Sequence, residues 1–332
     1  MDENKNALQV EHLTIDYVTA DGTVHAVNDV SFSIGRQRVM GLVGETGAGK
    51  TSTALAIMNL IPSPPGVIRS GKINVNGYDT LSMSDSALDK VRGKEVAMIF
   101  QDPMTALNPV LTIVDQITES ILLHENISKS DAVKKAIRML EQVGIKGNRA
   151  YDYPHQLSGG MKQRVVIAIA LCCNPNLLIA DEPTTALDVT IQAQVLELIE
   201  ELREEFHTSM LLITHDLGII AEMCDEVSVM YAGQIVESGS IKDVFTQTLH
   251  PYTEGLFNSL PNIHDRSVRL HPIPGLMPDP TDLPSGCPFH PRCRYAKEIC
   301  SREKPVMREL GRDHFAACLA YADPEFRIDR SK

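Results

Sequence analysis

The sequence predicts an α/β fold built around a phosphate-binding loop. Residues 44–51 read GETGAGKT, which matches the P-loop pattern G-x-x-x-x-G-K-[ST]. An apolar run at residues 37–43 precedes the loop, and residues 51–60 after it have helical composition. Strand-like and helix-like patterns then alternate to about residue 237, which favours a layered core of strands and helices.

Composition limits the classes of function. The 332-residue chain is long enough for about two domains and carries a net charge of −12. An acidic balance argues against a nucleic-acid binder, which needs a basic face. The longest wholly apolar run, residues 165–173, falls far below the roughly 20 residues of a membrane-spanning helix. The polar start, MDENKNALQV, does not resemble a signal peptide. We therefore expect a cytosolic chain whose membrane role comes through partners.

The N-terminal part predicts an antiparallel β subdomain. Residues 8–18 and 24–34 are rich in β-forming residues, and Asp21-Gly22 between them is a strong hairpin turn. The segment PSPPG at residues 62–66 ends the helix that follows the P-loop. Further strands are expected at residues 71–78 and 96–100.

Residues 102–172 have a helical pattern and predict a helical subdomain inserted in the core. Within it, residues 130–143 carry apolar side chains at helical spacing, with Ser130 as the expected N-cap and Gly144 as the stop. The core then returns as alternating elements, in the order strand 177–180, helix 191–206, strand 210–214, a helix after residue 215, and strands 227–231 and 234–237. The apolar stripe Val195, Leu198 and Ile199 of the second of these is expected to pack in the core.

Each residue type in the P-loop has a chemical task. Its glycines permit backbone angles that turn N–H groups toward an anion, and the helix that follows adds its positive N-terminal end. Lys50 reaches the β- and γ-phosphates, and the Thr51 hydroxyl can bind Mg²⁺. The predicted cofactor-binding loop comprises Gly44, Glu45, Thr46, Gly47, Ala48, Gly49, Lys50, Thr51 and Ser52.

A second acidic motif follows the predicted strand 177–180. Asp181 and Glu182 stand where a buried strand delivers acids beside a P-loop, and Asp181 is expected to hold Mg²⁺ through water. These motifs alone indicate a nucleotide site.

Residues 157–164 read LSGGMKQR, and this octet has no role in a generic P-loop enzyme. With it, the chain resembles the ATP-binding-cassette (ABC) family from about residue 8 to residue 245. Further residues occur in the order typical of that family, namely Tyr17, Gln101, the segment Ala186-Leu187-Asp188, and His215.

The resemblance implies two cassettes that face each other head to tail with two ATP molecules between them. Ser158, Gly159 and Gly160 would then cap the γ-phosphate bound by the opposite cassette, and Asp188 would reach that cassette. The simpler interpretation of LSGG, a glycine-containing helix N-cap, accounts for only part of the octet.

The resemblance also implies roles within one cassette. Glu182 would be the general base that polarises the attacking water. His215 would contact the γ-phosphate, and Gln101 would sense Mg²⁺, which places Thr51, Gln101 and Asp181 around the metal. Tyr17 would stack on adenine, with a packed strand tyrosine as the alternative. Glu182, His215, Lys50 and Gln101 are the predicted catalytic residues.

Three segments sharpen the resemblance. Residues 100–109 (FQDPMTALNP), residues 180–190 (ADEPTTALDVT) and His250-Pro251-Tyr252-Thr253 are similar to the D-type ATP-binding subunit of bacterial oligopeptide/dipeptide importers in the peptide/nickel family. This implies an ATPase domain at residues 1–249, an extension at residues 250–332, and ATP hydrolysis that powers peptide import. Nickel or another small solute remains open as cargo. A soluble cassette ATPase outside transport is disfavoured, because such relatives carry long coiled-coil insertions or two cassettes.

The same resemblance implies partners and a location. The partners would be a homologous second ATPase in a heterodimer, two transmembrane permease subunits and an extracytoplasmic substrate-binding protein. The chain would lie at the cytoplasmic face of the cell membrane as a peripheral protein.

The extension is rich in Pro and Gly and contains four of the seven cysteines, Cys287, Cys293, Cys300 and Cys318. In a cytosolic chain such a cluster favours metal over disulfides, but the spacing C-x5-C-x6-C-x17-C does not choose the metal. The resemblance implies a [4Fe–4S] cluster, with zinc as the second choice and free thiols as the third. We expect an extended segment without its own core that needs the metal to fold. The other three cysteines are expected to be ordinary buried thiols.

Overall fold

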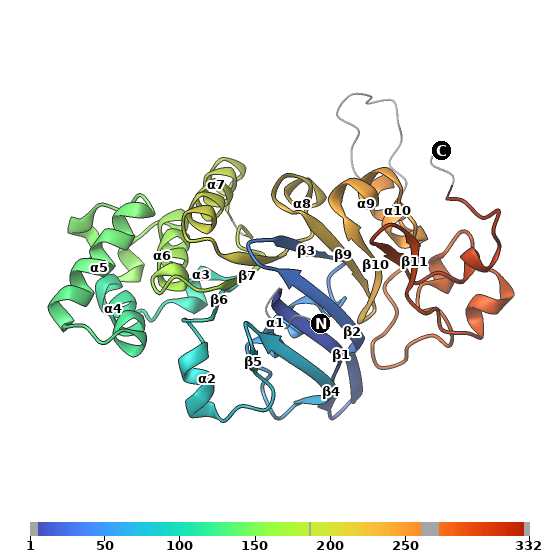
Figure 1. Ribbon diagram of the computed structural model, residues 1–332, viewed down its shortest axis with the longest axis horizontal. Coiled ribbons are helices and arrows are strands. Elements are labelled where there is room, and N and C mark those ends of the chain that lie inside the picture. The colour runs from blue at the N-terminus through green and yellow to red at the C-terminus, as the bar shows by residue number, and fades with distance from the viewer. Residues whose placement is uncertain (1–5, 186, 260–271, 329–332) are drawn as a thin grey trace.

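The structure is a computed structural model that describes residues 6–185, 187–259 and 272–328. Three regions follow one another along its longest axis in Figure 1: the helical subdomain, the α/β core, and the C-terminal extension, with the N-terminal β sheet against the core. The predicted α/β class with an antiparallel β subdomain and a helical subdomain is confirmed.

The N-terminal sheet has the strand order β2-β1-β4-β5 and is antiparallel. Its strands are β1 (Asn6–Thr19), β2 (Gly22–Gly35), β4 (Gly66–Val75) and β5 (Tyr78–Asp79). The predicted hairpin turn at residues 21–22 joins β1 to β2, where Thr19 pairs with Gly22. Strand β4 begins at Gly66, five residues before the predicted start, because Val67 and Ile68 pair with Asp16 and Ile15 of β1.

The core sheet has the order β11-β12-β10-β9-β3-β8-β7-β6. Strands β6, β7, β8, β3 and β9 run parallel. Every residue of β3, β7 and β8 is buried, which explains their continuous apolar runs. The bounds of the core strands are β3 (Val39–Val43), β6 (Val96–Ile99), β7 (Leu177–Asp181), β8 (Ser209–Ile213), β9 (Glu226–Tyr231) and β10 (Gln234–Ser240). Parallel strands bring their carboxyl ends to one edge of the sheet, where ligands of α/β proteins bind.

The core has the three predicted helices, α1 (Lys50–Ile57), α7 (Val189–Glu205) and α8 (Leu217–Met223), in the predicted order. The core helices α2 (Asp85–Val91) and α9 (Ile241–Thr246) were not predicted. The stripe Val195, Leu198 and Ile199 on α7 is buried, as predicted.

The helical subdomain comprises α3 (Pro103–Ala106), α4 (Ile113–His124), α5 (Lys129–Gln142) and α6 (Gly159–Leu171), with 3₁₀ turns at Gly147–Arg149 and Pro154–Gln156. The predicted N-cap of α5 was wrong by two residues. Ser128, not Ser130, caps the helix, because its hydroxyl accepts from the Asp131 N–H at 3.1 Å. Gly144 ends this helix with a φ of 77°, as predicted.

The C-terminal extension is not the extended segment that the sequence predicts. It forms α10 (Pro251–Asn258), β11 (Arg308–Gly311), β12 (His314–Ala316) and 3₁₀ turns at His290–Arg292, Glu298–Ser301 and Leu319–Ala322. Strand β12 pairs antiparallel with β10, where Ala316 lies opposite Glu237. The extension therefore continues the core sheet, and a pairing between residues so far apart in the chain leaves no local sequence signal.

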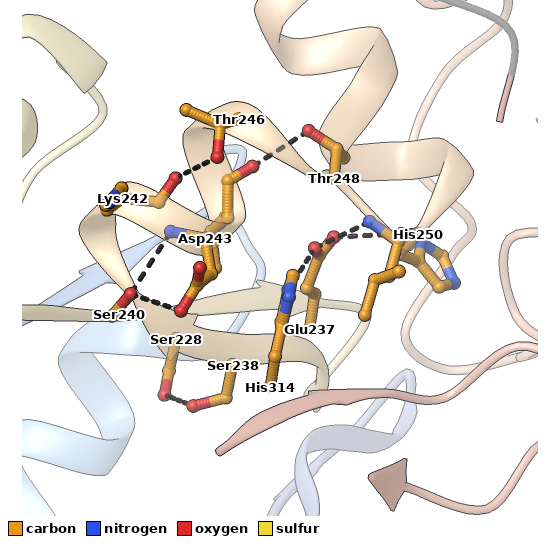
Figure 2. Close-up of polar contacts among 12 residues, drawn as sticks. Ser228, Glu237, Ser238, Ser240, Lys242, Asp243, Thr246, Thr248, His250 and His314 are labelled. Carbon is orange, nitrogen blue, oxygen red and sulfur yellow. Dashed lines mark hydrogen bonds and ion pairs between the residues drawn. The ribbon is translucent and has the colours of Figure 1, made fainter. Parts of the chain in front are cut away.

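A buried carboxylate holds this junction together. Glu237 on β10 is fully buried, and Figure 2 shows three donors around its side chain. They are the Leu249 N–H at 2.7 Å, the His250 N–H at 2.9 Å and the His314 ring Nε2 at 2.9 Å. One carboxylate thus ties β10 to the start of α10 and to β12, with both of its oxygens hydrogen-bonded.

Aromatic packing completes the attachment. The rings of Tyr231, Tyr252 and Phe289 meet pairwise, with centroids 4.6, 5.1 and 5.4 Å apart. Tyr231 belongs to the core, whereas Tyr252 and Phe289 belong to the extension, and all three are buried. The extension folds on the core because it shares the core's hydrophobic cluster.

The predicted iron–sulfur site is wrong, and so is its zinc alternative. In the three described stretches, no group of three or more His, Cys, Asp or Glu side chains could hold a metal ion. Cys287, Cys293, Cys300 and Cys318 are free thiols. Burial raises the pKa of Cys293 to about 12 and of Cys318 to about 11, which favours the protonated thiols. The prediction rested on four thiols clustered in the sequence and on the family resemblance, and among the described residues these thiols form no metal-binding group.

The remaining cysteines match their prediction in part. Cys172 and Cys173 are buried and Cys224 is half-buried, with its pKa raised to about 12 by burial. Among the helices of the described residues, none combines the length and apolar character that crossing a bilayer requires.

The attachment of the extension should depend on pH through His250. Burial lowers the pKa of this side chain to about 3, and its Nδ1 accepts from the Tyr252 N–H at 3.1 Å. Between this value and the ordinary histidine pKa of about 6.5, the unfolded chain binds a proton that the folded chain does not. The stabilisation from neutral His250 is therefore complete above pH 6.5 and declines as the pH falls toward 3.

The His250→Gln variant keeps an acceptor and a donor but cannot titrate. We expect its unfolding midpoint, followed by thermal denaturation, to fall less steeply between pH 7 and pH 5 than that of the unmodified chain. Equal slopes would show that His250 does not control this dependence.

Candidate functional site

The P-loop lies between β3 and α1, and two of its glycines, Gly44 and Gly49, are required by close backbone contacts. A Cβ atom on Gly44 would lie 2.1 Å from the Met230 carbonyl oxygen, and one on Gly49 would lie 2.3 Å from the Ala26 carbonyl oxygen. Gly49 also has a φ of 102°, in the left-handed region. The loop is therefore packed at backbone distance between the two sheets, and α1 starts directly after it at Lys50.

Lys50 is a buried cation at the centre of the loop. Its Nζ donates to the carbonyl oxygens of Gly44, at 2.7 Å, and Glu45, at 3.1 Å. Burial lowers the pKa of Lys50, and the charges of Glu182, Asp181 and Glu45 oppose that effect. A desolvated cation at the first residue of α1 is suited to bind phosphate oxygens.

A pocket of about 460 Å³ opens in front of the P-loop. It brings together residues from both sheets, from the end of β7 and from the C-terminal extension. The lining residues are Tyr17, Val24, Ala26, Thr46, Gly47, Ala48, Gly49, Lys50, Thr51, Ser52, Gln101, Glu182, His215 and Pro280. Gly44 and Glu45 belong to the same loop behind this lining.

One end of the pocket is apolar. Tyr17 lies there with Val24, Ala26 and Pro280, and its hydroxyl donates to the Ser52 hydroxyl at 3.1 Å. The tyrosine residue is half-buried and lines the cavity. This position suits stacking on an aromatic base better than it suits a role in core packing alone.

The other end of the pocket is polar and centres on Glu182. Its Oε2 accepts from Gln101 Nε2 at 3.0 Å and from the Thr185 hydroxyl at 2.9 Å, and its Oε1 lies 3.3 Å from His215 Nδ1. Glu182 has a φ of 45°, uncommon for a residue other than glycine, which marks it as held by its surroundings. Its N–H donates to the Ile213 carbonyl at the end of β8 at 2.8 Å.

Asp181 lies one residue earlier and is buried at the carboxyl end of β7. Burial raises its pKa, and a hydrogen bond with the Thr51 side chain opposes that effect. Within the part of the chain that the structure describes, its Oδ1 has no hydrogen-bond partner. An unsatisfied carboxylate oxygen beside a hydroxyl is a donor set that Mg²⁺ prefers, so Asp181 and Thr51 fit the expected ion, with Gln101 in the same pocket.

Gly44, Glu45 and Asp181 adjoin this pocket without lining it, whereas four other predicted residues lie at helix ends and do not line it. Ser158 caps α6 and accepts from the Met161 N–H, and Asp188 caps α7 and accepts from the Ile191 N–H at 3.0 Å. Gly159 is exposed, with open space at its Cβ position, whereas a Cβ on Gly160 would meet Ile191. These four residues therefore lie at the N-terminal ends of α6 and α7, outside the pocket of their own chain. Ala186 lies outside the described residues.

Sequence reasoning missed contacts from the extension. Pro280 lines the apolar end of the pocket, and Tyr252 and Arg292 contact Glu45 of the P-loop. Tyr252 lies in the segment HPYT, and Arg292 directly precedes Cys293, but no local pattern connects either residue to residue 45. Thr185 was also missed, although it follows the acid pair by three residues.

The chain matches the family described as ABC transporter over residues 27–185, and the family described as oligopeptide/dipeptide transporter, C-terminal region, over residues 236–300. The chain belongs to the ABC transporter family. Its extension is of the type found in oligopeptide and dipeptide transporters, which confirms the predicted resemblance.

Two curated relatives are similar over nearly their whole length. The oligopeptide transport ATP-binding protein AppD of Bacillus subtilis is 48% identical over 95% of this chain and 97% of its own. The oligopeptide transport ATP-binding protein OppD of Escherichia coli is 46% identical over 94% of this chain and 92% of its own. Both names describe ATP-binding proteins and mention no iron–sulfur group.

A solved structure supports the cassette fold. The dimeric structure of MJ0796, described as a bacterial ABC transporter cassette, has a TM-score of 0.63 and 25% sequence identity. The match covers 70% of this chain and 98% of the MJ0796 chain.

Removal of the carboxylate charge at Asp181 should separate nucleotide binding from its dependence on Mg²⁺. In the Asp181→Asn variant, we expect ATP affinity in EDTA to stay close to that of the unmodified chain, because Lys50 and the loop amides are intact. The factor by which added Mg²⁺ increases ATP affinity should then be at least about ten times smaller than in the unmodified chain. This is the scale expected for the loss of a charged ligand. Equal Mg²⁺ effects in a fluorescent-nucleotide titration would exclude Asp181 from the metal site.

Proposed function

We propose that the chain hydrolyses ATP to power the import of di- and oligopeptides, as one ATP-binding subunit of an ABC transporter. The observation that carries this proposal is the single pocket that joins the P-loop to Gln101, Glu182 and His215. The names of the relatives and the match to the transporter C-terminal region support peptides as cargo. No observation favours nickel or a role outside transport.

Lys50 and the amides of residues 44–51 bind the β- and γ-phosphates, and α1 directs its N-terminus at them. Thr51 and Asp181, with Gln101 in the neighbouring pocket lining, would hold Mg²⁺, which when bound would neutralise charge on the phosphate oxygens. Tyr17 and the apolar end of the pocket take the adenine.

Glu182 acts as the general base for the attacking water. It accepts the water proton as the oxygen bonds to the γ-phosphorus and the bond to the β-phosphate oxygen breaks, which yields ADP and phosphate. Gln101 and Thr185 hold one carboxylate oxygen, so the side chain is fixed in place. His215 lies beside the other oxygen with 69% of its side chain exposed, which leaves it able to contact a γ-phosphate.

The exposed residues of the segment LSGG, together with Asp188, complete a second nucleotide site on an opposite cassette. Ser158, Gly159 and Gly160 cap the γ-phosphate bound there, and Asp188 contacts that cassette. The support is their position at exposed helix ends outside the chain's own pocket. The opposite cassette is a homologous second ATPase, and the assembly adds two permease subunits and an extracytoplasmic substrate-binding protein. The chain lies at the cytoplasmic face of the membrane, bound through the permeases.

The central test replaces the base. The Glu182→Gln variant keeps the shape of the side chain but removes the charge that accepts the proton. In the reconstituted transporter, with the matching substitution in the second ATPase, we expect ATP binding to persist while ATP hydrolysis and peptide uptake fall by about 10²-fold or more. Near-normal hydrolysis would exclude Glu182 as the base.

A second prediction concerns assembly. The isolated chain should hydrolyse ATP slowly, because the groups that complete its site come from another cassette. Hydrolysis measured as phosphate release should rise when the second ATPase and the permeases are added in proteoliposomes. Full turnover by the monomeric chain would contradict a shared site.

A further inference from the structure

The C-terminal extension contacts Glu45 of the P-loop. The Arg292 guanidinium donates to both of its carboxylate oxygens, from Nη1 to Oε2 at 3.0 Å and from Nη2 to Oε1 at 3.2 Å. The Glu45 N–H donates to the Tyr252 hydroxyl at 2.9 Å. The extension thus holds both the side chain and the backbone of a P-loop residue.

The Arg292 side chain is fixed and largely dry. Only 8% of it is exposed, against 28% of Glu45. Its Nε donates to the Pro274 carbonyl at 2.9 Å, Nη1 lies 3.4 Å from the Tyr231 hydroxyl, and the guanidinium lies 5.8 Å from the centre of the Tyr231 ring. These contacts fix the orientation of the planar guanidinium group. A lysine ammonium could not make the same set of directed hydrogen bonds.

Glu45 places a negative charge in the loop that is proposed to bind phosphates, behind the pocket lining. Its carbonyl oxygen accepts from Lys50 Nζ, and its carboxylate is one of the charges that act on the pKa of Lys50. An unpaired carboxylate in this position would repel the phosphates of a nucleotide, most strongly in a site shielded from water. Arg292 supplies the compensating charge, so the local charge of the loop depends on the extension.

The extension also reaches the opposite end of the pocket. The His25 N–H on β2 donates to the Pro280 carbonyl at 2.9 Å, and Pro280 lines the cavity with Tyr17. The same chain segment therefore borders the nucleotide pocket at its apolar end and supports its phosphate end.

We propose that Arg292 is a positioning residue of the nucleotide site, which neutralises Glu45 and holds the P-loop so that phosphate binding depends on the docked extension. This inference rests on the proposed function, since it takes the pocket to be an ATP site. Arg292 acts through Glu45 and does not itself line the cavity. The extension is then part of the nucleotide site as well as a continuation of the core sheet.

The test is a double-mutant cycle on the full chain with Arg292→Met, Glu45→Gln and both together. The affinities of ATP, ADP and AMP would be measured by competition against a fluorescent ATP analogue. Arg292→Met exposes the Glu45 charge, so we expect ATP affinity to fall by about tenfold, ADP affinity by less, and AMP affinity least. Adding Glu45→Gln removes that charge and should recover most of the lost ATP affinity. Arg294→Met is the matched control, because Arg294 pairs with Glu254 inside the extension, and it should leave all three affinities unchanged.

Each other outcome is decisive. Equal losses for the three nucleotides, with no recovery in the double variant, would make Arg292 a purely structural staple and overturn the inference. Unchanged ATP affinity in Arg292→Met would overturn it too. If Arg292→Met does not fold, Arg292→Gln and its double variant with Glu45→Gln give the same comparison. Failure of the unmodified chain to bind ATP would instead contradict the proposed function itself.

Discussion

The nucleotide pocket depends on one constraint, the approach of the P-loop to two other backbones. Gly44 lies against the Met230 carbonyl at the end of β9, and Gly49 lies against the Ala26 carbonyl on β2. The Gly233 N–H also donates to the Ala48 carbonyl at 3.0 Å, so the loop is bonded to the turn after β9. Because both sheets touch the loop, the pocket can take an apolar face from the N-terminal sheet and acids from the core.

The extension adds a third contact to the same loop, and it is attached to the core by polar and aromatic contacts of its own. Glu237 ties it to β10 with three donors, and the aromatic cluster of Tyr231, Tyr252 and Phe289 continues the core. Tyr252 belongs to both arrangements, since its ring packs in that cluster and its hydroxyl accepts from Glu45. Docking of the extension and the shape of the P-loop are therefore coupled through shared residues.

Much of the cassette was predictable because its signals are local. The P-loop is contiguous in the sequence. Asp181 and Glu182 come at the end of a buried strand, which its apolar run predicts. The contacts that were missed join distant residues: Arg292 to Glu45, Pro280 to His25 and β12 to β10. The expectation of an extended segment failed for the same reason, because composition alone cannot show that Phe289 and Tyr252 pack on the core. The cysteine prediction failed because closeness in sequence does not show that four thiols meet at one point in the fold.

A structure of the full chain with bound ATP and Mg²⁺, stabilised by Glu182→Gln, tests the coupling of loop and extension most directly. We predict the β- and γ-phosphates within hydrogen-bonding distance of Lys50 and the loop amides, the adenine between Tyr17 and Pro280, and Arg292 still paired with Glu45. A bound nucleotide that leaves Arg292 turned away from Glu45, or an adenine that touches neither Tyr17 nor Pro280, would contradict a nucleotide site built jointly by the cassette and its extension.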